Sequence, residues 1–282
     1  MKIAIASGKG GKGKTTVATN LAHVAARGGR TVAYLDCDVE EPNGGIFLNP
    51  VIDRQCPIEK LIPAIDPALC TRCGLCARAC RYGAIASLPN QTLLFAELCH
   101  SCGGCLLACP ANAIREVPRP IGTLRSGKSG DVQFVEGTLH VGEAMSPPAI
   151  REVKSAAPPA ELILLDAPPG TSCPVVETVR GCDRVILVTE PTPFGLNDLA
   201  LAVEMVRAMK MPFAVVINRA GDGNGRVREY CDRGRIPVLA EIPDDRAVAE
   251  AYSRGQMICE AVPAFRSCIE QLLHRLEDGR SR

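Results

Sequence analysis

The sequence predicts a doubly wound α/β domain with a mostly parallel sheet, interrupted by a small cysteine-rich α+β domain. Two observations lead to this prediction. Short, continuously apolar segments alternate with helical patterns, and one stretch holds cysteines at short intervals among Pro and Gly residues. Strands of a parallel sheet are buried on both faces, so they are apolar throughout. A chain of 282 residues is long enough for one large domain and a small insert.

Composition excludes several classes of protein. Apolar residues make up 46% and charged residues 22%, as in ordinary globular domains. A net charge of +1 offers no basic surplus for nucleic acid or an acidic membrane, so neither partner is expected. The N-terminal sequence MKIAIASGKGG lacks the apolar core of a signal peptide, which predicts a cytoplasmic location. In such a protein, 15 cysteines indicate metal binding or redox chemistry.

The expected elements of the α/β domain follow one another from the N-terminus. A strand over residues 2–7 (KIAIAS) leads into a glycine-rich loop and then a helix over residues 14–27. A second buried strand is expected at residues 31–35, and others at 162–165, 185–188, 213–217 and 237–242. Period-2 alternation over residues 132–141 predicts a β-hairpin that returns the chain to the sheet. Residues 264–276 carry one apolar stripe and predict a packed terminal helix.

The glycine-rich loop predicts a phosphate site. Residues 8–15 (GKGGKGKT) fit G-x-x-x-x-G-K-[ST], directly after a strand and before a helix. Backbone N–H groups of such a loop turn toward phosphates, and the helix N-terminus adds its positive dipole end. We expect Lys14 to contact the β and γ phosphates of ATP and the Thr15 hydroxyl to bind Mg²⁺. The predicted ATP-binding residues are Gly8, Lys9, Gly10, Gly11, Lys12, Gly13, Lys14, Thr15 and Thr16.

Three aspartates follow apolar strands and complete the predicted site. Asp166 ends the strand LILLD and is the expected Walker B acid, a catalytic and Mg²⁺-binding residue. Asp36 and Asp38 follow the second strand. The carboxyl ends of parallel strands gather ligands at one edge of a sheet, so the three positions support one another. Strand-end aspartates that cap a loop remain the alternative for Asp36 and Asp38.

The additional lysine of the loop, Lys9 in KGGKGKTT, resembles the deviant Walker A group, to which MinD, ParA and the nitrogenase iron protein belong. The resemblance implies that Lys9 reaches across an ATP-sandwich homodimer to the partner's phosphates. Residues 36–43 (DCDVEEPN) resemble the family's switch I and are called the switch segment below. By resemblance, Asp38 activates the attacking water, Asp36 holds Mg²⁺ through water, and Asn218, at the end of AVVIN, contacts adenine.

Two cysteine runs follow the same C-x2-C-x2-C-x3-C spacing, and each member of the second lies 29 residues after its counterpart. This internal duplication resembles bacterial two-cluster ferredoxins, in which the fourth cysteine of each run binds the other cluster. The resemblance implies one [4Fe-4S] cluster on Cys70, Cys73, Cys76 and Cys109, and a second on Cys99, Cys102, Cys105 and Cys80. Zinc is the competing metal, but its ligand pairs are usually separated by longer loops. Cys80-Arg81 departs from the expected Cys-Pro.

The predicted domains follow from these motifs. A P-loop ATPase domain comprises residues 1–62 and 119–282, and residues 63–118 form the inserted ferredoxin-like 2[4Fe-4S] domain. Most of the seven remaining cysteines are expected in the core. Cys173 is the exception, because it follows the Asp166 loop where the nitrogenase iron protein places a ligand of its intersubunit cluster; that role stays open here.

The whole chain resembles MinD-superfamily ATPases with an inserted ferredoxin domain. This implies an ATP hydrolase whose dimer closure is coupled to electron transfer through the clusters to a redox partner. An alternative is an ATP-dependent factor that assembles or delivers clusters to an accepting protein, although the C-terminal C-x-x-C of Mrp-type carriers is missing. A positioning ATPase like MinD or ParA is a third possibility, but no membrane-seeking or DNA-binding surface is visible in the sequence.

Overall fold

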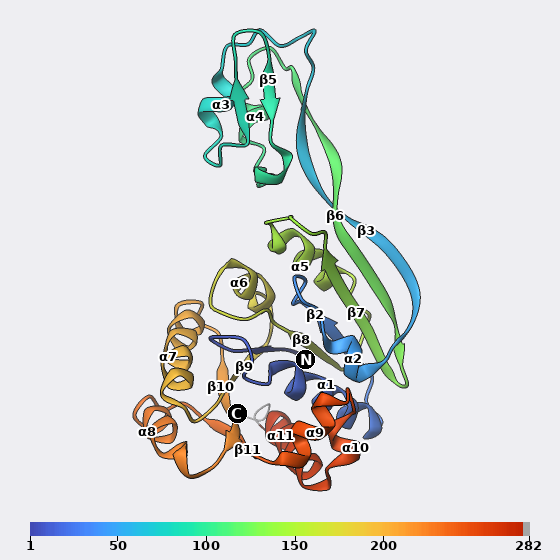
Figure 1. Cartoon of the computed structure of the whole chain (residues 1–282), viewed down its shortest axis with the longest axis vertical. Helices are drawn as coiled ribbons and strands as arrows, with labels where there is room; N and C mark the ends of the chain where they lie inside the picture. Colours follow the sequence, from blue (N-terminus) through green and yellow to red (C-terminus); the bar gives the residue numbers. More distant parts are fainter. Residues whose placement is uncertain (279–282) are drawn as a thin grey trace.

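The computed structural model describes residues 1–278, which form a sheet-centred body and a projecting arm (Figure 1). The body is built on a nine-stranded sheet with the order β11-β10-β9-β1-β8-β2-β7-β6-β3. The strands are β1 Lys2–Ala6, β2 Val32–Asp36, β3 Val51–Ile65, β6 Ile114–Ser129, β7 Val132–Leu139, β8 Leu162–Asp166, β9 Arg184–Thr189, β10 Phe213–Ala220 and β11 Val238–Pro243. All neighbours from β11 to β7 pair in parallel, whereas β6 pairs antiparallel with β7 and β3. The predicted doubly wound, mostly parallel sheet is confirmed.

Helices cover both faces of this sheet. One face packs against α1 Lys14–Arg27, α9 Arg246–Ser253, α10 Ile258–Ala261 and α11 Pro263–Asp278. The other face carries α5 Ser146–Ser155, α6 Cys173–Val179, α7 Pro193–Ala208 and α8 Gly225–Arg233. The predicted terminal helix is therefore confirmed as packed, with Phe265, Ile269 and Leu272 fully buried. No helix within residues 1–278 is both long and apolar enough to cross a membrane.

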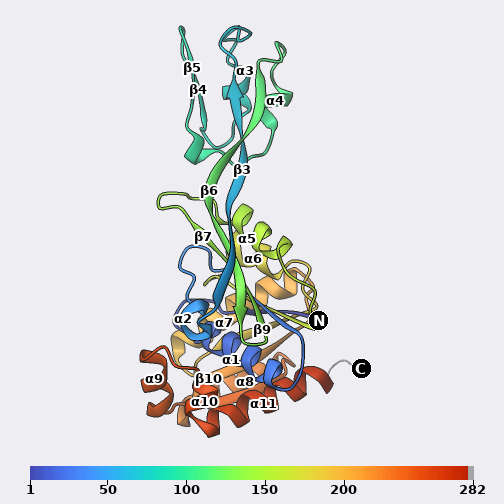
Figure 2. The same cartoon turned by 90° about the vertical axis from the view of Figure 1, so that its right-hand side faces the viewer.

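A long antiparallel ribbon leaves the edge of the sheet. β3 and β6 pair along their whole length, from Val51↔Lys128 to Ile65↔Ile114. The β6–β7 hairpin expected from the sequence is present, but β7 reaches only to Gly122 of β6. Beyond that point the ribbon continues without a third strand, and Figure 2 shows it rising from the body. We call this free part, residues 58–65 and 114–121, the arm.

The sequence does not predict the arm, because its strands contain prolines at positions 63, 118 and 120. Proline cannot donate to a ladder and usually argues against a strand, yet it is tolerated where one side of the strand has no neighbour. The arm provides such free sides. It also contains both predicted domain boundaries, since Pro63 pairs with Glu116 and Leu61 with Pro118.

A small module occupies the far end of the arm (Figures 1 and 2). Residues 66–113, called the tip module, contain α3 Leu75–Ala79, β4 Ile85–Ser87, β5 Thr92–Leu94, the 3-10 helix η1 Ala96–Leu98 and α4 Gly104–Leu107. β4 and β5 form a separate two-stranded antiparallel sheet. The tip module thus combines short helices with short strands, while its assignment as a ferredoxin-like domain stays a prediction.

Candidate functional site

The loop between β1 and α1 is closed by two glycines that have no room for a side chain. A Cβ on Gly8 would lie 2.0 Å from the backbone oxygen of Asp198. Gly13 adopts φ 92°, and a Cβ there would lie 2.3 Å from Asn218 Nδ2. That same amide donates a hydrogen bond to the Lys12 carbonyl at 3.0 Å. The sequence therefore needs glycine at both ends of the loop, and Asn218 braces it from β10.

The three lysines of the loop have different environments. Lys14 begins α1 and is 7% exposed, whereas Lys9 is exposed to solvent. Lys12 is also buried, but its ammonium contacts Glu190 at 2.5 Å and Asp198 at 3.9 Å. Its side chain is thus held by the residue that follows β9 and by α7, and only its backbone remains for the predicted ATP contact. Sequence reasoning missed Glu190, since no motif marks it; its only signal is its position just after the apolar strand β9.

The three predicted aspartates meet at the carboxyl ends of neighbouring strands. Asp36 of β2 and Asp166 of β8 stand opposite each other in the parallel register. Asp36 accepts hydrogen bonds from the backbone N–H groups of Asp38, Asn43 and Gly44, at 3.2, 3.1 and 2.9 Å. The carboxylate therefore fixes the switch segment, a role close to the loop-capping alternative. Its predicted water-mediated contact with Mg²⁺ stays a prediction.

Asp166 has one oxygen engaged and one free. The Tyr34 hydroxyl donates to Asp166 Oδ2 at 2.9 Å, while Oδ1 is buried without a hydrogen-bond partner. A buried carboxylate oxygen without a partner is costly unless something completes it. A bound Mg²⁺ would do so, because this ion prefers carboxylate oxygens and hydroxyl ligands. The donor set around Asp166 and Thr15 therefore fits the predicted metal.

The electrostatics of the site favour a cation. Burial, and next the Asp166 carboxylate, raise the pKa of Asp36 well above its ordinary value. Burial likewise raises the pKa of Asp166, which the Thr15 hydroxyl and then the Lys14 ammonium partly offset. Burial raises the pKa of Asp38 to about 6, with Lys14 as the main opposing influence. The Lys14 ammonium thus offsets two of these carboxyl groups, those of Asp38 and Asp166, and a divalent cation would balance the remaining negative charge.

The two cysteine runs are interleaved in the tip module. One cavity is lined by Cys70, Cys73, Cys76 and Cys109, and a second by Cys80, Cys99, Cys102 and Cys105. Three cysteines of each set come from one run and the fourth from the other. Backbone N–H groups of Ser101 and Ala113 donate to Cys99 Sγ and Cys109 Sγ, at 3.4 and 3.3 Å. A backbone N–H group thus points at a sulfur atom in each of the two cysteine sets.

The backbone repeats the sequence duplication at the same offset. Left-handed conformations pair as Arg72 with Ser101, Gly74 with Gly103, and Gly83 with Asn112. The Phe95 N–H donates to the Ala84 carbonyl, and its counterpart, the Asp66 N–H, donates to the Ala113 carbonyl, at 2.8 and 2.7 Å. The two halves of the tip module are therefore equivalent in conformation as well as in cysteine spacing.

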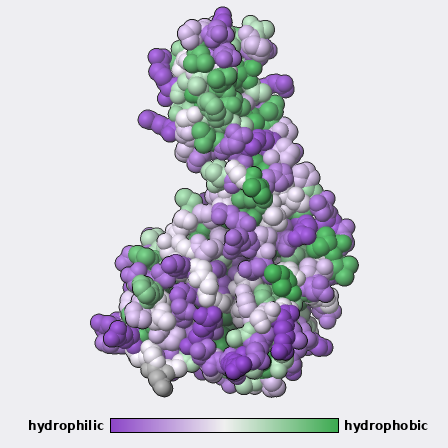
Figure 3. Space-filling view, viewed as in Figure 1, coloured by the Kyte–Doolittle hydropathy of each residue, from purple (hydrophilic) through white to green (hydrophobic). Residues whose placement is uncertain are grey.

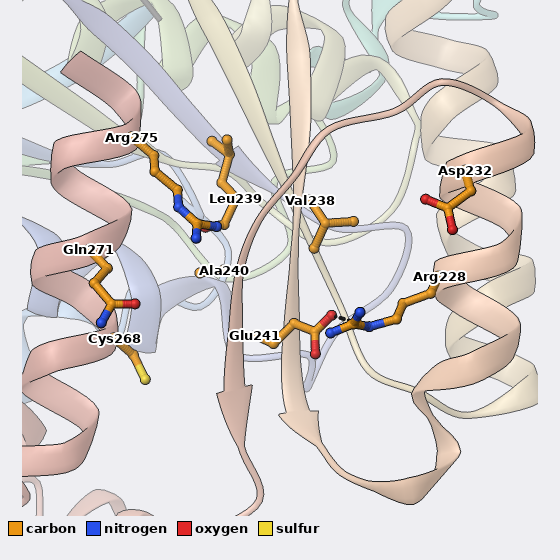
Figure 4. A pocket seen from close by; sticks show the side chains of 9 residues that line it. All are labelled: Arg228, Asp232, Val238, Leu239, Ala240, Glu241, Cys268, Gln271 and Arg275. Carbon is orange, nitrogen blue, oxygen red and sulfur yellow. Dashed lines mark hydrogen bonds and ion pairs between the residues drawn. The ribbon is translucent and has the colours of Figure 1, made fainter. Parts of the chain in front are cut away.

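Among residues 1–278, no three His, Cys, Asp or Glu side chains are placed to hold a single metal ion. Four other cysteines are buried in the body, as expected, whereas Cys173 is exposed at the start of α6. A separate polar cavity of about 380 Å³ lies beside the edge strand β11, between α8 and α11. Figure 4 shows Arg228 turned toward Glu241 within it. This cavity shares no residue with the P-loop or with the cysteine sets.

Comparisons with known proteins match both the sequence and the fold. A family model described as the CobQ/CobB/MinD/ParA nucleotide binding domain matches residues 3–258. An uncharacterized protein of Methanocaldococcus jannaschii is 33% identical, over 99% of this chain and 97% of its own. The iron-sulfur cluster carrier protein of Pyrococcus horikoshii is 25% identical, over 98% of this chain and 87% of its own.

A solved structure adds the fold. The septum site-determining protein MinD of Pyrococcus horikoshii, complexed with Mg-ADP, has a TM-score of 0.62 at 21% identity and covers 98% of this chain and 95% of its own. The family model spans most of the chain, including the P-loop and all three strand-end aspartates. The chain therefore belongs to the CobQ/CobB/MinD/ParA family of P-loop nucleotide-binding proteins.

Proposed function

We propose that this protein is an ATP hydrolase whose nucleotide state controls electron transfer through two [4Fe-4S] clusters held in a ferredoxin-like tip module. The observation that carries the proposal is the pairing of a P-loop site in the body with two four-cysteine cavities at the end of the arm. In this proposal residues 63–118 form the inserted domain, and the remainder forms the ATPase domain of a cytoplasmic protein.

At the nucleotide site, each residue has a proposed task. The P-loop backbone and Lys14 would bind the phosphates, while Thr15 and Asp166 would hold Mg²⁺. The Asp38 carboxylate would orient a water molecule that attacks the γ-phosphorus, and the bond to the β-phosphate oxygen would break to release ADP. Lys9, being exposed, is free to reach the phosphates of a second protomer in a homodimer. Asn218 would contact adenine at the base of the loop.

In the tip module, the two cysteine sets would each hold one cluster. Four thiols around a cavity suit a cluster whose iron atoms each bind a separate thiolate, and such clusters supply one-electron chemistry. Seven exposed large apolar residues lie between positions 61 and 107, and Figure 3 shows apolar surface gathered on the module. Exposed apolar surface of this kind is typical of protein docking sites. It supports a protein partner that exchanges electrons.

Cluster delivery is the second candidate, because relatives such as the Pyrococcus horikoshii protein are named iron-sulfur cluster carriers. A carried cluster must leave easily. Here each cysteine set takes its fourth member from the opposite run, so release would separate the two halves of the module. This interleaving favours resident clusters and hence electron transfer.

The test compares wild type with Lys14→Ala after anaerobic preparation. We expect the midpoint potentials and EPR spectra of the wild-type clusters to change when an ATP analogue replaces ADP. Lys14→Ala should keep both clusters and lose the change, since it loses the ammonium that contacts the phosphates. Normal ATP hydrolysis by Lys14→Ala would contradict the assigned active site. Transfer of clusters to an apo-protein, with nucleotide-independent potentials, would favour delivery instead.

A further inference from the structure

An ion-pair network joins the body, the arm and the tip module, and the pair at its centre, Lys60 with Glu143, is buried. Glu143 lies in the loop between β7 and α5, and its side chain is 2% exposed. Its carboxylate accepts hydrogen bonds from Lys60 Nζ at 2.6 Å and from Arg119 Nη1 at 2.8 Å. Lys60 of β3 and Arg119 of β6 are paired across the arm, and the Lys60 side chain is 1% exposed. One carboxylate from the body thus binds both strands of the arm.

The network continues into the tip module. The same Arg119 guanidinium contacts Glu97 Oε1 at 3.3 Å. Glu97 belongs to η1, which ends one residue before Cys99, and the Cys99 N–H donates to the Ala96 carbonyl within that turn. Cys99 lines the second cysteine cavity, together with Leu61 of the arm. A largely exposed ion pair, with the Glu97 side chain 61% exposed, thus connects Arg119 with the turn that precedes Cys99.

The network also reaches the nucleotide site. The Leu139 N–H, at the end of β7, donates to the carbonyl of Val39 at 2.8 Å, and Val39 directly follows Asp38. From Leu139 the chain turns into the Glu143 loop, closed by a hydrogen bond from the Glu143 N–H to the His140 carbonyl at 3.1 Å. The His140 N–H in turn donates to the Ile121 carbonyl at the base of the arm, at 2.9 Å.

Packing reinforces this backbone route. Gly137 of β7 lies against Val39 and Ile58, so closely that a Cβ there would be 3.0 Å from Val39 Cγ1 and 3.3 Å from Ile58 Cδ1. Both side chains are 1% exposed. Close-packed residues of this kind move together, since no free volume separates them. A displacement of the switch segment must therefore change the β7 end, the Glu143 loop or the first residues of the arm.

We propose that Glu143 is the positioning residue through which the switch segment sets the position of the arm and, through Arg119 and Glu97, of Cys99. Burying Lys60 with Glu143 costs desolvation that an apolar pair would avoid, so stability alone gives weak reason for the pair. Ion pairs that are also hydrogen bonds depend on direction, so this network instead fixes one arrangement of the body and the arm. This inference rests on the proposed function. It predicts that the bound nucleotide acts mainly on the cluster held by the second cysteine set.

The test follows amide hydrogen exchange in the full-length protein, prepared anaerobically, with ADP or a non-hydrolysable ATP analogue. In wild type we expect exchange in residues 38–44, 96–99 and 139–145 to differ between the nucleotides, by about fivefold or more. In Glu143→Gln the difference should persist at 38–44 but disappear at 96–99. Lys60→Met/Glu143→Met removes both buried charges together and should give the same result, even if Glu143→Gln unfolds.

Glu177→Gln provides the matched control. Glu177 also pairs with an arginine, Arg151, at 3.3 Å, but on α6 of the body and outside the route. Glu177→Gln should leave every nucleotide-dependent difference in amide hydrogen exchange unchanged. The inference is overturned if residues 96–99 respond normally in both Glu143 variants, or if the wild-type switch segment responds while 96–99 do not. A wild type whose clusters keep fixed potentials would contradict the proposed function, whatever the exchange pattern shows.

Discussion

The environment of Asp38 disfavours the ionised form of its carboxyl group. Burial raises its pKa to about 6, although Lys14 opposes the rise. An unfolded aspartate ionises near its ordinary value of 3.8, so between these two values the folded protein binds more protons than the unfolded chain. The free energy of unfolding therefore falls as the pH rises through this window, and the loss is complete above pH about 6.

Asp38→Asn should remove this penalty. At pH 7, without nucleotide, we expect the variant to be more stable by on the order of 1 kcal/mol, after allowance for partial exposure of the side chain. Urea unfolding at pH 5 and at pH 7 measures the gain, which should be larger at pH 7. ATP turnover should fall by about a hundredfold or more. If Asp38→Asn exceeds wild type in stability by the same amount at both pH values, ionisation of Asp38 does not destabilise the folded protein.

At the residue scale, the sequence predicts which residues lie together where a motif fixes chemistry and spacing together. Lys14, Thr15 and Asp166 lie close together, as the spacing required. The anchoring of the switch segment by Asp36 depends on backbone N–H groups that no residue type reveals. Likewise, Glu190 meets Lys12 across a separation of 178 residues, and such a contact exists only once the sheet is assembled.

At the scale of elements, the duplicated cysteine runs predict that each run supplies the fourth ligand of the other run's cluster. Cys109 lies in the second run but lines the first cavity, with Cys73. Cys109→Ser should therefore disturb the same cluster as Cys73→Ser, and the double variant should lose no more iron than either single variant. EPR spectra and iron content provide the measurement. Cys80→Ser serves as the opposite case, since it should affect the other cluster.

The elements were predictable where apolar periodicity was strong. The parallel strands and the terminal helix occur close to their expected bounds, because burial on both faces leaves a continuous apolar signal. The β3–β6 ribbon gives no such signal, since most of its β3 residues are exposed or half-buried. It is held together by pairing between distant segments, from Ile65↔Ile114 to Val51↔Lys128. Local propensity contains little information about such pairing.

For the whole molecule, Lys9 allows the proposed homodimer to be tested apart from nucleotide binding. Its side chain is exposed, whereas Lys14 is buried beside the carboxylates. Lys9→Ala should therefore bind ATP with nearly unchanged affinity but fail to dimerise with a non-hydrolysable analogue. Light scattering and nucleotide titration separate the two effects. Dimers formed by Lys9→Ala as readily as by wild type would contradict the role inferred for this lysine.

The arm also has a mechanical consequence. Its free part spans about eight residues in each strand, or roughly 26 Å at about 3.3 Å per residue. If the paired strands tilt as one rigid piece about the base of the arm, the tip module at the far end moves with them. A tilt of about a tenth of a radian at the base of the arm would move the tip module by roughly 3 Å over a length of this order. A slight adjustment at the base is thus magnified into a shift large enough to bring a docking surface into or out of reach.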